Sequence, residues 1–280
     1  MKAVNHISRT FESISAIAGH LDSHEPQVEG WIIDGGSGQR PDKSWDHGMS
    51  LSDATEVCRK GGNWVEGGQN LKEVTLEMAS MRRDGMAPII ENDVTGYLPD
   101  IDAFLAGDPC NMLSEGEGDD ANGKIVKIGV HVFQSAMTSV EQKLNRGAAI
   151  MSCIDALEDA GYSIELWAVN TASSGTQSVD YRVLIKEAGQ PWSPAAAAFG
   201  IIHPAFFRKV VFALAEREKG YDDYCKGQGI GYEPDGFDIV FPALLGSDSK
   251  WASTKEGALK HVTDKTNEYL RGEKQDDDER

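Results

Sequence analysis

The second half of the sequence alternates short β-branched segments with longer amphipathic ones, and this alternation limits the fold more than any other feature. Residues 124–133 (KIVKIGVHVF) form a run typical of a half-buried strand. Residues 144–157 then carry apolar side chains at helical spacing, after a capping sequence that begins at Thr138. Strands that alternate with helices pack in layers. We therefore predict an α/β fold, a layered mixed sheet with flanking helices, with α+β as the alternative.

The other segments extend this pattern along the chain. Gly161 follows the predicted helix at a position where a left-handed residue commonly ends one. The apolar periodicities predict further strands at 163–169, 181–186 and 237–241, and helices at 11–21, 52–60, 71–83, 204–217 and 256–270.

Composition divides the chain into four parts. Residues 107–123 are rich in Gly, Asp, Glu and Asn, which is typical of a linker. We predict a mostly helical N-terminal region at 1–113, an acidic Gly-rich hinge at 114–123, an α/β domain at 124–272 and an acidic tail at 273–280.

The net charge of −18 restricts the class of partner. Nucleic-acid-binding domains usually show a basic face, so this charge alone argues against DNA. No apolar run approaches the roughly 18 residues of a membrane span, and Arg9 and Glu12 interrupt any signal-peptide core. The four cysteines include no CxxC pair, so we expect neither a zinc ribbon nor a disulfide framework. A reducing cytoplasm is the expected location.

Motifs for phosphate or metal binding are incomplete. Residues 118–124 (GDDANGK) have the spacing of a P-loop, but Ile125 stands where Ser or Thr would hold magnesium, and a strand is predicted to follow. The segment after Val130 (HVFQSAMTS) stands where a von Willebrand A-type domain carries its DxSxS metal motif. The aspartate is absent, and Ser135 and Ser139 alone cannot hold a hard cation. We therefore expect no metal and no cofactor.

The sequence also shows no complete arrangement of catalytic residues. His20 and His24 have the spacing of two zinc ligands on one helix face, but the sequence shows no third ligand. It contains neither a nucleophile elbow nor a kinase signature. We expect a protein that is not an enzyme.

Basic residues interleave with tryptophans between residues 40 and 83. Proteins bind single-stranded nucleic acid by stacking bases on aromatic rings while cations follow the backbone. The alternative is that the tryptophans are core residues, because tryptophan is usually well buried. A second basic set lies on the helices of the later domain. The predicted DNA-binding residues are Arg40, Lys43, Trp45, Arg59, Lys60, Trp64, Arg82, Arg83, Lys143 and Arg146.

The C-terminal run of Asp276, Asp277, Asp278 and Glu279 is compact and acidic. Blocks of like charge often serve as interaction tails. We predict a regulatory tail that competes with DNA for a cationic groove, with a merely solubilising end as the alternative.

Four segments resemble a family of phage-encoded proteins. They are residues 44–68 (SWDHGMSLSDATEVCRKGGNWVEGG), 100–113 (DIDAFLAGDPCNML), 144–169 (LNRGAAIMSCIDALEDAGYSIELWAV) and 201–218 (IIHPAFFRKVVFALAERE). Within that family, the chain is similar to the podovirus Drc-type proteins, which bind single-stranded DNA and act as cofactors of the phage RNA polymerase. The resemblance implies binding at melted promoters, recruitment of the polymerase and a fold other than an OB barrel.

The sequence therefore leads to the hypothesis of a non-enzymatic, single-stranded-DNA-binding cofactor of phage RNA polymerase in the cytoplasm of an infected bacterium. Capture of the open strand would stabilise the melted promoter by mass action. The alternative is a metal-free, von Willebrand A-like adaptor for protein interactions. No membrane partner is expected, and self-association is left open.

Overall fold

The main sheet has five strands in the order β1-β7-β6-β5-β8. The computed structural model describes residues 5–27, 48–82, 90–94, 98–99, 101–115, 124–135, 138–174, 177–218 and 232–270. The strands of the sheet are β1 (Asn5–Phe11), β5 (Ile125–His131), β6 (Ser163–Ser174), β7 (Gln177–Lys186) and β8 (Ile239–Phe241). Strands β6, β5 and β8 are parallel, and β7 is antiparallel to β6. The α/β prediction is confirmed, and the sheet is not a closed barrel.

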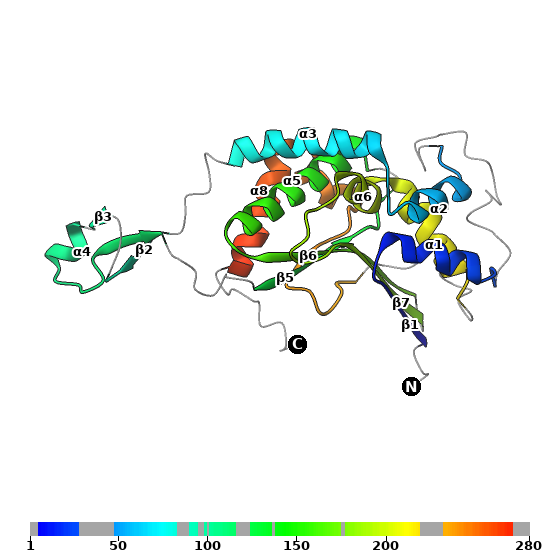
Figure 1. The fold of residues 1–280 in the computed structure, drawn as a ribbon, viewed down its shortest axis with the longest axis horizontal. Coiled ribbons are helices and arrows are strands. Elements are labelled where there is room, and N and C mark those ends of the chain that lie inside the picture. The colour runs from blue at the N-terminus through cyan, green and yellow to red at the C-terminus, as the bar shows by residue number, and fades with distance from the viewer. Residues whose placement is uncertain are drawn as a thin grey trace.

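Helices cover one face of this sheet. Figure 1 shows α3, α5, α6 and α8 above β5 and β6, with α1 and α2 toward β1 and β7. The helical segments are α1 (Ile14–Ser23), α2 (Leu51–Arg59), α3 (Val65–Arg82), α5 (Val140–Asp159), α6 (Pro194–Ala197), η1 (Ala198–Ile202), η2 (Phe206–Val211), α7 (Phe212–Glu216), η4 (Gly246–Ser253) and α8 (Lys255–Leu270).

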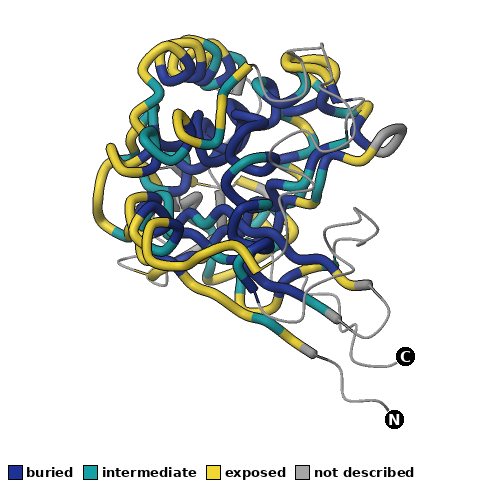
Figure 2. Tube along the Cα trace, turned by 90° about the vertical axis from the view of Figure 1, so that its right-hand side faces the viewer, coloured by how far each residue is buried: buried dark blue, intermediate teal, exposed yellow. Residues whose placement is uncertain are grey.

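Alternation along β5 places the core between sheet and helices. Val126, Ile128 and Val130 are at most 1% exposed and belong to the hydrophobic cluster that also contains residues of α3, α5 and α8. The intervening residues of β5 face the opposite side of the sheet, as the period of two requires. Figure 2 shows the resulting pattern, with buried segments inside and exposed segments along the outer helices.

Helix α5 begins at a capping box. The Ser139 hydroxyl accepts a hydrogen bond from the Gln142 backbone N–H at 3.1 Å, and the Gln142 side chain accepts one from the Ser139 N–H at 2.9 Å. The helix therefore starts one residue later than the Thr138 box predicts. At its other end Gly161 has φ 91°, the left-handed conformation that the sequence analysis expects there.

The segment predicted as one helix at 204–217 is part of a longer, bent helical unit. Two π-helical stretches, η1 and η2, flank the break at His203. Within the described residues, no single helix is long and apolar enough to span a membrane. The pair Pro194–Ile202 and Phe206–Glu216, bent by 62°, meets that criterion only when its two parts are taken together.

The predicted N-terminal region does not form a unit separate from residues 124–272. Strand β1, which the sequence analysis did not predict, pairs in parallel with β7, so that Ile7 lies opposite Val179. Helix α3 packs against α5. Residues 1–113 thus contribute a strand and three helices to the same sheet and core.

A second, antiparallel sheet has the order β2-β4-β3. It contains β2 (Ile90–Asp93), β3 (Leu98–Pro99) and β4 (Met112–Glu115), with α4 (Ile101–Leu105) between β3 and β4. Residues 116–123 of the predicted hinge and the whole predicted tail at 273–280 lie outside the described residues.

Candidate nucleic-acid interface

A cavity of about 330 Å³ lies where β1, α1 and the residues after α7 meet. Its lining combines two arginines and two histidines with one carboxylate and one apolar side chain. The lining residues are Ile7, Arg9, His20, His24, Arg217 and Glu218. Such a mixture of cations and flat rings is suited to an anionic, aromatic ligand.

Arg9 reaches the cavity from β1. Its Nε and Nη2 donate hydrogen bonds to the two carboxylate oxygens of Glu218, both at 2.8 Å. This bidentate pair raises the pKa of Arg9, mainly through the side-chain hydrogen bond with Glu218, so the guanidinium stays charged. The Arg9 side chain is 46% exposed and remains open to a further anion.

The two histidines stack at the end of α1. Their ring centroids are 4.0 Å apart and their planes differ by 19°. The His24 Nδ1 bonds the carbonyl of His20 at 2.9 Å, and Phe11 meets the His20 ring edge-on at 5.5 Å. Burial, followed by the field of His24, lowers the pKa of His20 below 6.5. His20 is therefore mostly neutral at pH 7, and the pair offers an aromatic surface.

Arg217 joins the ends of α1 and α7. Its Nε donates to the carbonyls of Leu21 at 3.2 Å and His24 at 2.7 Å, and its Nη1 donates to Ala213 at 2.9 Å. A cation at the C-terminal end of a helix is favourable because the last carbonyls carry partial negative charge. These bonds fix the guanidinium beside the histidine pair.

Helix α2 packs against α1, and two of the predicted DNA-binding residues, Arg59 and Lys60, lie at its C-terminal end. Arg59 bonds Asp22 at 2.8 Å and Glu56 at 2.5 Å, and the Lys60 ammonium lies 3.3 Å from Glu56. Both cations are exposed, but both share carboxylates. Their role as DNA contacts stays a prediction. The sequence analysis did not identify Arg9 or Arg217, since neither lies in a basic run.

The surroundings of Trp64 agree with the alternative that the tryptophans of this region are core residues. Its ring meets His203 edge-on at 4.4 Å and packs against both hydrophobic clusters of the core. A Cβ on Gly67 would lie 2.1 Å from this ring, so only a glycine at position 67 leaves room for the indole. Trp64 is therefore a partly buried side chain that packs into the core, which favours the core alternative over a role in stacking bases.

The predicted DNA contacts Lys143 and Arg146 lie inside the protein. They are 3% and 1% exposed, because α5 is covered by α3, α8, η1 and η4 as well as by the sheet. A DNA backbone cannot reach such side chains, so the prediction of direct surface contacts is wrong for both. Their helix looks like an ordinary amphipathic one in sequence, and nothing in its pattern signals that its polar side is also covered.

The remaining predicted residues fall outside the description. For Arg82, the last residue of α3, the backbone alone is described. The others outside the described residues are Arg40, Lys43, Trp45, Arg83, Asp276, Asp277, Asp278 and Glu279.

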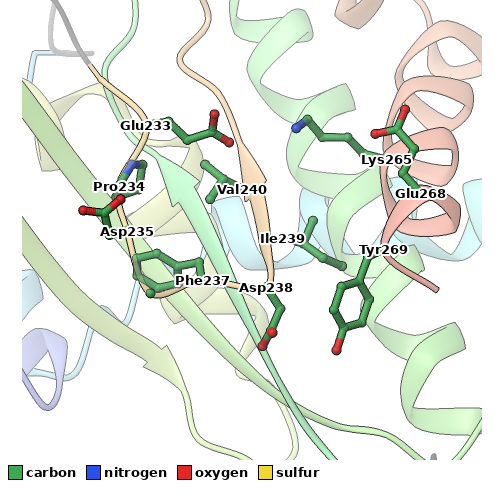
Figure 3. Close-up of a pocket in the computed structure, with 11 residues that line it drawn as sticks. Glu233, Pro234, Asp235, Phe237, Asp238, Ile239, Val240, Lys265, Glu268 and Tyr269 are labelled. Carbon is green, nitrogen blue, oxygen red and sulfur yellow. The ribbon is translucent and has the colours of Figure 1, made fainter. Parts of the chain in front are cut away.

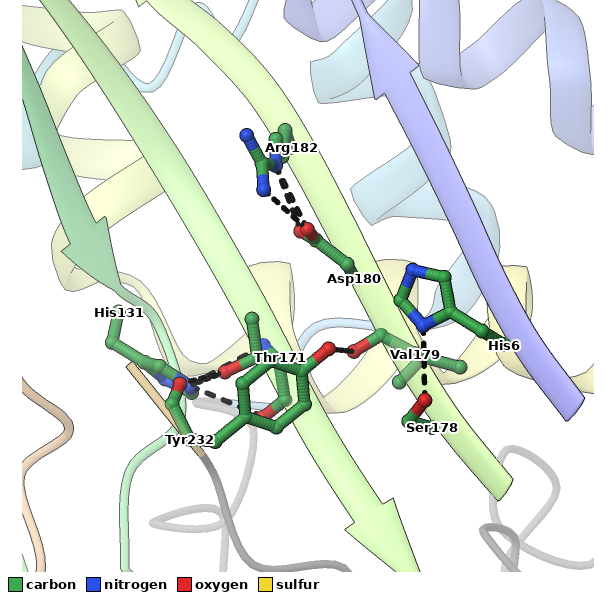
Figure 4. Close-up of polar contacts among 8 residues, drawn as sticks. All are labelled: His6, His131, Thr171, Ser178, Val179, Asp180, Arg182 and Tyr232. Atoms are coloured by element: carbon green, nitrogen blue, oxygen red, sulfur yellow. Dashed lines mark hydrogen bonds and ion pairs between the residues drawn. The ribbon is translucent and has the colours of Figure 1, made fainter. Parts of the chain in front are cut away.

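The opposite face of the sheet carries a polar network that links four segments (Figure 4). The His131 Nδ1 accepts from the Phe133 N–H at 3.2 Å, and its Nε2 lies 3.0 Å from the Thr171 hydroxyl and 3.3 Å from the Thr171 backbone nitrogen. That hydroxyl donates to the carbonyl of Tyr232, whose own hydroxyl donates to the carbonyl of Val179 at 3.1 Å. Burial, with the field of Arg146, lowers the pKa of His131 to about 4. This network ties the segment after residue 231 to the sheet.

A second cavity, of about 410 Å³, lies between β8 and α8 (Figure 3). Its lining includes the carboxylates of Glu233, Asp235, Asp238 and Glu268. Among the described residues, no group of three or more His, Cys, Asp or Glu side chains is arranged to hold a metal ion.

One family matches most of the chain in comparisons with known proteins. A domain of unknown function, DUF7192, matches residues 1–271. No curated protein and no solved structure matches the chain.

Proposed function

The chain belongs to the DUF7192 family, and from that premise we propose that it binds single-stranded DNA without catalysing a reaction and assists a phage RNA polymerase at melted promoters. Two independent considerations support this. One is the resemblance of four segments to podovirus single-strand-binding cofactors. The other is the cavity at the end of α1.

The observation that carries the proposal is the juxtaposition of Arg9 and Arg217 with the stacked pair His20 and His24 around one cavity. An unpaired strand exposes both a phosphate and a base face at every nucleotide. A guanidinium binds the phosphate, and an imidazole ring stacks on the base. A duplex buries its base faces, so it loses the second interaction.

The electrostatics of this site imply binding of moderate strength. Glu218 neutralises part of the charge of Arg9, and Asp22 and Glu56 do the same for Arg59. In single strands each neutralised phosphate contributes a slope of about −0.7 to log K against log salt. Two engaged arginines thus predict a slope of about −1.4, much smaller than that of a strongly basic protein.

The test compares a labelled 20-nucleotide strand with its duplex by fluorescence anisotropy. Arg9→Gln and His20→Ala remove one cation and one ring, and Lys260→Gln is the matched control because its side chain is 77% exposed on α8. A lost stacking contact is worth about 1–3 kcal/mol, so His20→Ala should weaken single-strand binding by about 5- to 150-fold. Equal affinity for the duplex, or equal affinities of all three variants, would contradict the proposal.

One observation favours the adaptor as a second candidate. The segment that follows β5 adjoins the end of β8 through a bridge between Gln134 and Leu244. This is the carboxyl end of the sheet, where open α/β sheets bind their ligands. If the protein is an adaptor, substitutions at the exposed Leu245 should abolish recovery of a protein partner from infected cells while DNA binding is absent from the start.

A further inference from the structure

Helix α4 carries three large apolar side chains on one exposed face. Ile101, Phe104 and Leu105 are 60%, 62% and 77% exposed. Positions i, i+3 and i+4 are neighbours on the surface of a helix, so these three side chains form one stripe. Single apolar side chains are ordinary at a protein surface, but a contiguous group of them marks an interaction surface.

Backbone hydrogen bonds define the end of α4. The Gly107 N–H donates to the Phe104 carbonyl at 3.1 Å, and the Asp108 N–H donates to the Ala103 carbonyl at 3.0 Å. Gly107 has φ 74°, the left-handed conformation of a Schellman motif. The Asp108 carboxylate then accepts from the Cys110 N–H at 2.9 Å. The apolar stripe therefore lies on a helical turn with a defined end.

The small sheet holds α4 away from the main sheet. Strands β2 and β3 both pair with β4, and α4 connects β3 to β4. We define residues 90–115 as the α4 module. Figure 1 shows β2, β3 and α4 to one side, separated from the main sheet and its helices. The apolar stripe is thus accessible to another molecule.

The charge of the α4 module restricts what can cover the stripe. The module contains six Asp and Glu residues and no Lys, Arg or His. A second copy of the chain would bring six more acids to the same contact, and nucleic acid or an anionic membrane would bring phosphates. The net charge of the whole chain is −18, so the rest of the chain is acidic as well. Like charges brought together at an interface are unfavourable. The complementary surface is an apolar groove with a basic rim.

We propose that α4 inserts Ile101, Phe104 and Leu105 into an apolar groove with a basic rim on the phage RNA polymerase. A helix that lays anchors at i, i+3 and i+4 into a groove is a recurrent mode of protein recognition. A polymerase holds nucleic acid, so it carries basic surfaces. The choice of the polymerase as partner rests on the proposed function, whereas the chemistry of the groove follows from the α4 module alone.

The position of α4 permits simultaneous binding of a strand and the polymerase. Figure 1 places α4 and α1 at opposite ends of the molecule, and the cavity of the proposed strand site lies beside α1. The two contacts therefore use different residues and are measured separately.

The first experiment measures the affinity of the full chain for the purified RNA polymerase of the same phage by biolayer interferometry. Phe104→Ser/Leu105→Ser removes most of the stripe, and Leu76→Ser is the matched control, because Leu76 is also 62% exposed but lies on α3. Burial of two large apolar side chains predicts that the double variant binds about 30-fold more weakly or worse, while Leu76→Ser binds like the wild type.

Two further variants separate lost contacts from lost structure. Phe104→Leu/Leu105→Met keeps the stripe apolar and should retain the affinity for the polymerase. Ile101→Ser changes one exposed side chain and should weaken binding less than the double serine variant. All these variants should bind a single strand as the wild type does, since the strand site lies elsewhere.

A salt titration tests the basic rim. Salt screens the attraction between unlike charges, so the affinity for the polymerase should fall between low and physiological salt. An affinity that does not change with salt, or that increases, would overturn the basic rim.

The outcomes distinguish this proposal from the proposed function. Equal polymerase binding by the wild type and the double serine variant, with Ile101→Ser unchanged as well, would overturn docking through α4 and leave strand binding intact. Polymerase binding by none of the proteins would overturn both proposals. Self-association in sedimentation velocity, or binding to anionic vesicles, that is lost in the double serine variant would assign the stripe to a second copy or a membrane and overturn the proposal.

Discussion

Protonation of His131 should destabilise the protein as the pH falls from 7 toward 4. The ring is 3% exposed and hydrogen-bonded as a neutral imidazole. Its pKa is about 4 in the folded state against 6.5 for the ordinary side chain, so the unfolded chain binds a proton that the folded chain rejects. The contribution of the neutral His131 ring to the stability of the fold is fully present above pH 6.5. It is lost as the pH falls from 6.5 to about 4.

The size of the effect follows from the two pKa values. A difference of 2.5 pKa units lowers the free energy of unfolding by about 3 kcal/mol at a pH below both pKa values. About 2 kcal/mol of this is lost between pH 7 and 4.5. His131→Gln keeps a hydrogen-bonding side chain but cannot be protonated. Relative to the wild type, this variant should therefore gain about 2 kcal/mol in unfolding free energy on acidification over the same range.

Urea denaturation at pH 7 and 4.5, followed by tryptophan fluorescence, measures this difference. The double comparison cancels the titration of all other groups, because both proteins share them. His6→Gln serves as the matched control, since it removes a histidine at the exposed edge strand β1. If His131→Gln and the wild type lose equal stability on acidification, the buried neutral imidazole does not exist and the argument fails.

Three further predictions concern packing, a buried ion pair and the tail. Gly68→Ala should lower the free energy of unfolding by about 1–3 kcal/mol in urea denaturation, because the new Cβ at position 68 would lie 2.7 Å from the Ala195 nitrogen of α6. Lys186→Ala should lower the free energy of unfolding by about 3 kcal/mol in the same assay, because it removes the ammonium that lies 2.5 Å from the Glu158 carboxylate. This value is at the low end for buried pairs, since the Glu158 side chain is 28% exposed. Deletion of residues 273–280 should raise single-strand affinity at low salt, measured by anisotropy, because it removes a tethered polyanion that competes for the cations; unchanged affinity at low and physiological salt would refute self-competition.

The elements with strong local signals were predictable from sequence. The strand at 125–131 and the helices at 140–159 and 255–270 lie within a few residues of their predicted positions, because apolar periodicity and capping residues are local properties. Strand β1 was not predictable in the same way. Its residues NHISRTF are mostly polar, and its pairing with β7 depends on contacts more than 170 residues away.

The site residues show the same limit. Arg59 and Lys60 entered the prediction because they are adjacent basic residues at the end of a short helix. The cavity lining draws single residues from β1, α1 and the segment after α7, so no window of sequence contains it. The burial of Lys143 and Arg146 depends on how many neighbours cover α5, which is a tertiary property.

The parallel pairing of β1 with β7 sets an order of events during synthesis. The first strand emerges from the ribosome long before its partner at 177–186 and has no complete place in the sheet until then. Contacts so distant along the chain slow folding, since the intervening loop must close first. Until β1 pairs with it, β7 is an unprotected sheet edge and a template for pairing with another nascent chain. The seven residues of β1 therefore act as the native cover of that edge, and a chain that lacks them should be recovered mainly in aggregates.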